Sequence, residues 1–127
     1  MQLLLDTHSL LWWATDDKRL GGAARQAIAA PANAVFVSAV TIWEVAIKQA
    51  LGRLRAPDIP ELLVEQGFRD LPLTVAHAWA AGALPPIHRD PFDRALVAQA
   101  TLEGMVLVTA DELVMEYGGA VLHATRG

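Results

Sequence analysis

The sequence predicts an α/β fold with three layers (α/β/α), in which helices cover both faces of a central, mostly parallel sheet of about four or five strands. Short apolar runs alternate along the chain with longer segments of helical periodicity, which is typical of this class. Runs that are apolar at every position also indicate strands buried on both faces. The chain has 127 residues, the size of one ordinary domain, and no linker or repeat divides it. We therefore expect a single domain over residues 1–127.

The first half of the chain predicts two strands and four helices. Leu3 to Leu5 is a short apolar run, and residues 34–38 form a second run that is rich in β-branched side chains. Helical patterns follow these runs, over residues 7–14, 23–30, 40–51 and 57–67. Pro31 and Gly52 mark the ends of the second and third helices, because both residue types are common just after a helix C-terminus.

The second half predicts three further strands and three helices. The expected strands lie at residues 71–73, 105–108 and 120–122, and the expected helices at 74–81, at 90–103 and from 111 onward. Pro72 restricts the first of these strands to a sheet edge, where a missing N–H is tolerated. Asp90 and Pro91 form a strong helix start, because aspartate is a preferred N-cap and proline fits the first helical position.

Composition excludes several classes of protein. With 54% hydrophobic and 19% charged residues, the chain has ample apolar surface to fold, so disorder is excluded. The absence of cysteine excludes disulfides, thiolate zinc sites and a cysteine nucleophile. No run reaches the roughly 18 apolar residues of a membrane span, and the opening lacks the features of a signal peptide. We expect a soluble protein of the reducing cytoplasm.

Two acids follow predicted strands. Asp6 closes the run Leu3 to Leu5, and Asp111 comes shortly after residues 105–108. Ligands of open parallel sheets bind outside the carboxyl ends of the strands, so both acids are candidates for a site. The alternative for each is a simple N-cap of the helix that follows.

Two more acids share a helix face with apolar residues. Glu44 lies on a stripe with Val40 and Ile47, and Asp93 on a stripe with Leu96 and Val97. A buried carboxylate is costly unless a cation or strong donors meet it. The alternative for Glu44 is an i,i+4 ion pair with Lys48, and the alternative for Asp93 is a capping box with Asp90.

Convergence of the four acids would require a counter-cation. Oxygen ligands without cysteine favour Mg²⁺ or Mn²⁺ over zinc. The net charge of −4 arises from 14 acids and 10 bases, so setting these four acids aside leaves 10 of each. The negative balance is therefore compatible with a phosphate-containing substrate whose contact a metal mediates.

Four stretches carry a resemblance to a known family. They are LLLDTHSLLWW, VSAVTIWEVAIKQALGRL, LPPIHRDPFDRALVAQA and LVTADELVMEYG. In this order and spacing the chain resembles, nearly end to end, PIN-domain proteins of the VapC-type toxin group. HRDPFDR followed by ALVAQA is the most specific block.

The resemblance implies a metal-dependent endoribonuclease, the toxin component of a type II toxin–antitoxin pair. Carried over by position, the metal-binding and catalytic acids are Asp6, Glu44, Asp93 and Asp111, with Mg²⁺ or Mn²⁺ as cofactor. Asp6 and Asp93 would be the principal direct ligands, and the other two would complete the cage. The role of Asp90 is left open. Thr7, Ser38 and Thr109 are candidates for orienting ligands or water, and Ser38 is the one best explained as a cap.

The resemblance also implies partners: an RNA substrate, a cognate antitoxin and a second copy of the chain, with the tryptophan-rich helices as interface surface. Arg89 and Arg94 flank Asp93 and are either phosphate contacts or part of a solvated face. The four histidines lack the spacing of a zinc site, so no zinc site is expected.

Two alternatives stay open. A haloacid-dehalogenase-like phosphatase would use Asp6 as nucleophile, but it requires a second aspartate where this chain has His8. A PIN-like module kept only for interaction would lack the acids, which are all present.

Overall fold

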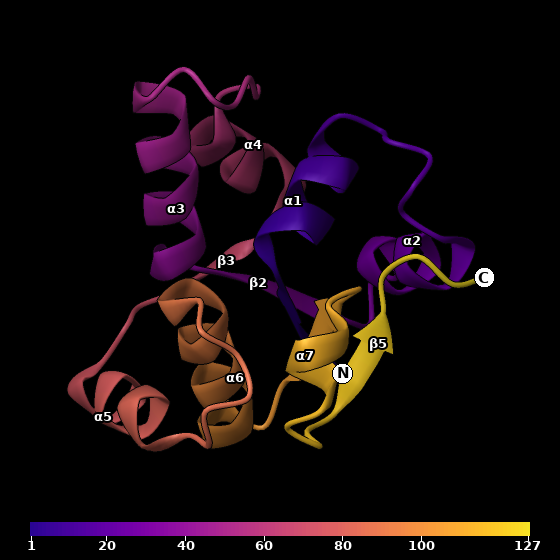
Figure 1. The fold of residues 1–127 in the computed structure, drawn as a ribbon. Helices are drawn as coiled ribbons and strands as arrows, with labels where there is room; N and C mark the ends of the chain where they lie inside the picture. Colours follow the sequence, from indigo (N-terminus) through magenta and orange to yellow (C-terminus); the bar gives the residue numbers. More distant parts are fainter.

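The computed structural model describes all residues, 1–127, and confirms the three-layer α/β/α architecture (Figure 1). Its centre is a five-stranded sheet in the order β3-β2-β1-β4-β5, and every neighbouring pair of strands is parallel. The strands are β1 (Gln2–Leu5), β2 (Ala34–Ser38), β3 (Arg69–Leu71), β4 (Val106–Thr109) and β5 (Val121–His123). The central strand β1 is flanked by β2 and β4, so all three end at the same edge of the sheet.

Helices cover both faces of this sheet, as Figure 1 shows. Leu3 and Leu5 point into the larger core cluster, which includes residues of the helices α1 (Thr7–Ala14), α2 (Gly22–Ala29), α3 (Ala39–Ala50) and α4 (Ile59–Gln66). Leu4 points to the opposite face, into a cluster with residues of α6 (Pro91–Glu103) and α7 (Glu112–Met115). The remaining helix, α5 (Val75–Ala83), packs on α6. Alternation along one strand thus builds two separate cores.

Leu3, Leu4 and Leu5 are all fully buried, which explains why β1 is apolar at every position. The same pattern in β4 buries Leu107 on one side and Val108 on the other. None of the helices has the length and hydrophobicity needed to cross a lipid bilayer.

The edge strand differs from the prediction. We expected it over residues 71–73, but β3 covers Arg69–Leu71, and Pro72 lies beyond it. The register explains the shift, because Leu71 pairs with Ser38, the last residue of β2. Pro72 therefore has no partner strand to pair with. The other predicted strands shift by only one residue at their ends.

Candidate functional site

Asp6 and Asp111 stand at the carboxyl ends of neighbouring parallel strands. Asp6 directly follows β1 and is buried; its Oδ1 accepts a hydrogen bond from the N–H of Ser9 at 2.8 Å. Asp111 follows β4 after one intervening residue, and its Oδ1 accepts from the N–H groups of Leu113 at 2.9 Å and Val114 at 3.2 Å. Each aspartate thus caps the helix that follows it. Because β1 and β4 pair in parallel, the two caps also lie at one edge of the sheet.

Asp93 lies in the first turn of α6. Asp90 caps this helix by accepting from the N–H of Phe92 at 2.8 Å, so it does not form the capping box with Asp93 that we considered. Oδ2 of Asp93 instead lies 3.2 Å from Nε2 of His88. Capping therefore accounts for Asp90, whereas Asp93 is directed at a group outside its own helix.

His88, Asp93 and Asp111 form one cluster. Nε2 of His88 is 2.9 Å from Oδ2 of Asp111, and one ligand-capable atom of each residue lies within 4.8 Å of the others. The three side chains are 12%, 22% and 35% exposed, so the cluster is accessible from solvent. Two carboxylates and an imidazole at such separations are a donor set that fits a divalent cation.

The surroundings of the cluster disfavour the charged forms of Asp93 and Asp6. Burial first, and then the charge of Asp90, raise the pKa of Asp93 to about 7, and the charges of Asp111 and Asp6 act in the same direction. Burial is also the main cause that raises the pKa of Asp6. The charge of Asp6, at the end of β1, acts on Asp93, so Asp6 lies near the cluster. A bound cation would relieve this repulsion.

The pKa values of His88 and Asp111 shift in opposite directions. Burial alone would lower the pKa of His88, but the hydrogen bond to Asp111 and the nearby carboxylates outweigh it and raise this pKa. For Asp111, burial would raise the pKa, but the hydrogen bonds from His88 and from two backbone N–H groups hold it below its usual value. Asp111 is therefore the acid whose surroundings favour the charged form, and Asp93 is the acid whose surroundings favour the protonated form.

Glu44 lies outside this cluster of atoms and has its own partners. Its side chain is buried; Oε1 accepts from Thr7 Oγ1 at 2.6 Å, and Oε2 pairs with Lys48 Nζ at 2.7 Å. The ion pair that we considered as the alternative for Glu44 is thus present. Thr7 is the residue after Asp6, so its hydroxyl links Glu44 to the end of β1.

The three hydroxyl residues that we expected near the site have different roles. Thr7 binds Glu44, as described above. Thr109 Oγ1 accepts from the N–H of Asp111 at 3.0 Å, and a side-chain hydrogen bond from Thr109 lowers the pKa of Asp6 against the effect of burial. Ser38 caps α3 and donates to Gln99 Oε1 at 2.6 Å, which makes it a structural residue.

Arg94 differs from both interpretations that we gave it. Its guanidinium donates to the carbonyl oxygens of Ala81, Leu84 and Pro85 at 2.8 to 3.1 Å, so it is neither part of a solvated face nor free for a phosphate. It also contacts the hydroxyl of Tyr117 at 3.3 Å. Arg94 holds the loop between α5 and α6, which carries His88.

His88 is the residue of the cluster that the sequence did not reveal. No H-x₃-H or H-E-x-x-H spacing includes it, since its partners come from α6 and from the end of β4. The one available signal was its position two residues before Asp90, inside the HRDPFDR block.

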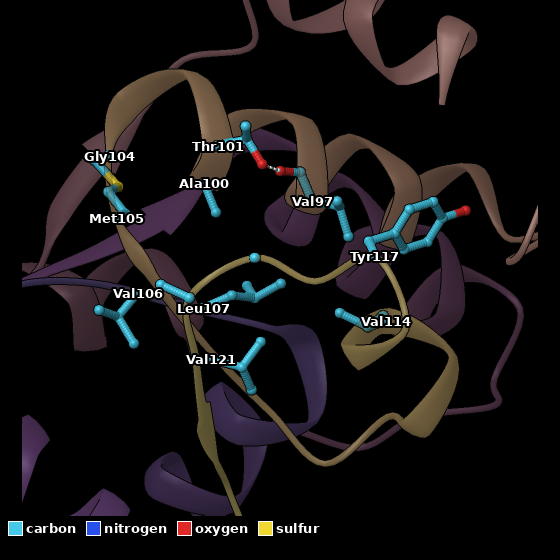
Figure 2. A pocket seen from close by; sticks show the side chains of 12 residues that line it. Val97, Ala100, Thr101, Gly104, Met105, Val106, Leu107, Val114, Tyr117 and Val121 are labelled. Carbon is cyan, nitrogen blue, oxygen red and sulfur yellow. Dashed lines mark hydrogen bonds between the residues drawn. The ribbon is translucent and has the colours of Figure 1, made fainter. Parts of the chain in front are cut away.

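A separate apolar pocket of about 320 Å³ lies between α6, β4 and the chain around α7 (Figure 2). Val97, Leu107, Val114 and Val121 line it. Because the lining contains no carboxylate or histidine, this pocket carries no hydrolytic chemistry. The acid cluster is the candidate active site.

A family model for the PIN domain matches residues 3–118. The chain belongs to the PIN domain family. Four sequence stretches predicted this membership, and the match confirms it. The haloacid-dehalogenase-like alternative for Asp6 is thereby set aside.

Comparison with individual proteins agrees with this assignment. The PIN domain is 35% identical over 113 residues to Ribonuclease VapC22 of Mycobacterium tuberculosis, and the match covers 86% of each chain. Its fold is similar to that of a chain in the crystal structure of VapBC2 from Rickettsia felis bound to a promoter DNA fragment, with a TM-score of 0.72 and 12% identity over 96% of this chain and 98% of that one. A toxin–antitoxin complex from Klebsiella pneumoniae gives a TM-score of 0.68 at 19% identity, over 98% and 99% of the two chains. At these identities the two structures support the fold alone.

Proposed function

We propose that this PIN domain is an endoribonuclease that depends on Mg²⁺ or Mn²⁺ and acts as the toxin of a type II toxin–antitoxin pair. The observation that carries the proposal is the convergence of Asp93 and Asp111, with Asp6 nearby: burial first, and then the charges of Asp90, Asp111 and Asp6, raise the pKa of Asp93 to about 7. The relationship to Ribonuclease VapC22 supports RNA as the substrate class.

We assign each acid a role in holding the metal. Asp6 and Asp93 are the principal direct ligands of the metal, and Asp111 completes the site from the end of β4. Glu44 acts from the periphery of the metal site, because Thr7 and Lys48 already bind its two carboxylate oxygens. A divalent ion held here supplies a more acidic bound water and polarises the scissile phosphate.

A basic cleft supports binding of the RNA backbone. It has a volume of about 540 Å³, and Thr7 lines it on the side of the acids. Its basic side chains are Arg19, Lys48, Arg53 and Arg55. Arg19 pairs with Asp17, which also lines the cleft, and Lys48 pairs with Glu44, so Arg53 and Arg55 are the cations without a carboxylate partner. Cations beside an acidic site can hold the phosphates that flank the scissile bond, so the overall charge of −4 does not prevent RNA binding.

An exposed apolar surface supports a homodimer. Trp43 is 61% exposed and lines a cleft together with Leu73 and Phe92, and Val75 and Trp79 of α5 are more than 80% exposed. These are among the tryptophans that we expected at an interface. We propose that a second copy covers this surface, and that the pair, with its antitoxin, acts in the cytoplasm. Light scattering should report a dimer of the 13.7 kDa chain, and Trp79→Lys should shift it to monomer.

The decisive experiment for function uses purified protein and total RNA. We expect cleavage with Mn²⁺ or Mg²⁺, arrest by a chelator, and no cleavage by Asp93→Asn, which keeps size and removes charge. Release of inorganic phosphate from a small monoester would instead indicate a phosphatase. Failure to cleave any RNA under these conditions would leave the domain as an interaction module.

A further inference from the structure

We propose that His88 is a positioning residue that donates a hydrogen bond through Nε2 to the acid cluster, and that it is not a ligand of the metal. The inference rests on the metal site proposed above and concerns the one non-carboxylate member of the cluster. Nε2 lies 2.9 Å from Oδ2 of Asp111 and 3.2 Å from Oδ2 of Asp93. Such distances suit a hydrogen-bond donor, but they also suit adjacent ligands in an octahedron of radius about 2.1 Å, which lie about 3 Å apart.

The second ring nitrogen decides between these two roles. Nδ1 of His88 accepts a hydrogen bond from the backbone N–H of Asp90 at 3.0 Å. An accepting Nδ1 carries no proton, so the proton of the neutral ring must be on Nε2. A histidine that binds metal through Nε2 has the opposite arrangement, with Nδ1–H donated to a carbonyl, carboxylate or water. With Nδ1 protonated, two N–H groups would face each other at Asp90.

The ring cannot easily turn to escape this constraint, because its loop is held at several points. The N–H of His88 donates to the hydroxyl of Tyr117 at 2.9 Å, and that hydroxyl donates to the carbonyl oxygen of Pro85 at 3.0 Å. Arg94 approaches the carbonyl oxygen of His88 at 3.3 Å. Tyr117, Arg94 and Asp90 thus fix both the backbone and the ring of His88.

His88 in turn fixes Asp111. Oδ1 of Asp111 accepts two backbone N–H groups, and Oδ2 accepts Nε2–H of His88. A carboxylate has about four lone-pair sites, so about one remains free, on Oδ2. That oxygen and Oδ2 of Asp93 both face Nε2 of His88, at 2.9 and 3.2 Å. The cation is therefore offered oxygen ligands only, which favours Mg²⁺ and Mn²⁺ over zinc.

The first test reads the tautomer directly in the metal-free protein. Because its neighbours raise the pKa of His88, the pH is increased until the ring has lost its second proton, and nitrogen-15 NMR of histidine-labelled protein then distinguishes the protonated from the unprotonated ring nitrogen. We expect His88 to carry its proton on Nε2, and to keep it when Mg²⁺ is added. A proton on Nδ1, in either state, would overturn the proposal. The metal-free arm gives a result even if no metal binds, in which case the proposed function fails instead.

The second test reads the metal. Bound Mn²⁺ should show no electron-spin-echo coupling to a coordinated imidazole nitrogen, whereas a ligand role for His88 predicts a coupling that disappears in His88→Gln. Mn²⁺ affinity should fall about tenfold in His88→Ala, as for other residues that orient metal ligands. His88→Gln keeps a donor at about the position of Nε2 and should restore most of the loss. Equal affinity of His88→Ala and wild type would overturn the positioning role, provided that circular dichroism shows both folded.

Discussion

The candidate site acids of this PIN domain fall into two regions, which differ in how the charge of a buried carboxylate is compensated. On the α3 side, Glu44 is buried beside a full set of partners, a hydroxyl at 2.6 Å and an ammonium at 2.7 Å. On the α6 side, Asp93 has only the edge of His88, at 3.2 Å, and faces the charges of Asp90, Asp111 and Asp6. The chain therefore supplies a permanent cation, Lys48, for the first region, whereas the second has only the titratable ring of His88.

This difference shows where a metal ion would contribute most. A carboxylate already paired with lysine gains little from a second cation, whereas Asp93, whose pKa burial and the neighbouring charges raise to about 7, gains more. The two regions also differ in how they are built. The Glu44–Lys48 pair is local to one helix turn, while the Asp93 cluster joins a loop, a helix and a strand end.

The largest expected effect is on RNA cleavage. Asp93→Asn and Asp6→Asn should each lower the rate by at least about 100-fold, because each removes a carboxylate that we propose as a direct ligand. Glu44→Gln should cost about tenfold, in the range of residues that act on a metal site through others. Rates are measured with saturating Mn²⁺, and far-UV circular dichroism verifies the fold. If Glu44→Gln is as inactive as Asp93→Asn, the two regions are not distinct.

The next effect is on stability without metal. Asp93→Asn should melt several degrees higher than wild type in chelator, for a gain of about 1–2 kcal/mol, because it removes a repelled charge. Glu44→Gln should melt at a lower temperature, for a loss of about 1 kcal/mol in the free energy of unfolding, because it leaves Lys48 without its partner. Mn²⁺ should then raise the melting temperature of wild type more than that of Asp93→Asn. A lower melting temperature for Asp93→Asn, with no metal shift in wild type, would contradict the cation-deficient cluster.

The same charge predicts how stability depends on pH. The pKa of Asp93 is about 7 in the folded chain, against an ordinary value of about 3.8, so between these values the folded state binds the extra proton. Stability of the metal-free protein should therefore fall as pH rises from about 4 to about 7. The raised pKa of His88 adds a further fall in stability only above about pH 6.5, as pH rises from its ordinary pKa through its folded value. Thermal melts in chelator across this range test it, and the slope should be shallower in Asp93→Asn.

The sequence predicts most of the fold because burial controls it. Leu3 to Leu5 can only be a strand with two covered faces, and Asp90-Pro91 can hardly avoid starting a helix. The edge strand was misplaced because its end depends on the length of β2, a long-range property that Pro72 does not encode. Local signals therefore identified the elements, and pairing set their limits.

The site is less predictable, for a related reason. Residue type and position single out the four acids, and the i,i+4 rule finds Lys48 as the partner of Glu44. His88 and Arg94 take their roles from a loop with no periodicity, whose shape depends on contacts with Tyr117 and backbone carbonyls. No spacing rule describes such contacts. The assignment of the four acids as ligands stays a prediction that the variants above test.

The smallest expected effect comes from removing the cation beside Glu44, which makes this region more similar to the Asp93 cluster. Lys48→Met removes the ammonium at 2.7 Å from Glu44 and leaves that carboxylate with Thr7 alone. Lys48 is 44% exposed, so the ion pair itself is screened, and its loss should cost only about 0.5 kcal/mol in chelator. Mn²⁺ affinity should rise about two- to fivefold, because one repelling charge is gone and Glu44 Oε2 becomes free. Calorimetric titration with Mn²⁺ measures this, and Lys48→Arg, which keeps the charge, should bind like wild type. Unchanged or weaker binding by Lys48→Met would mean that Lys48 does not compete with the metal, and that Glu44 lies too far from the cluster to take part.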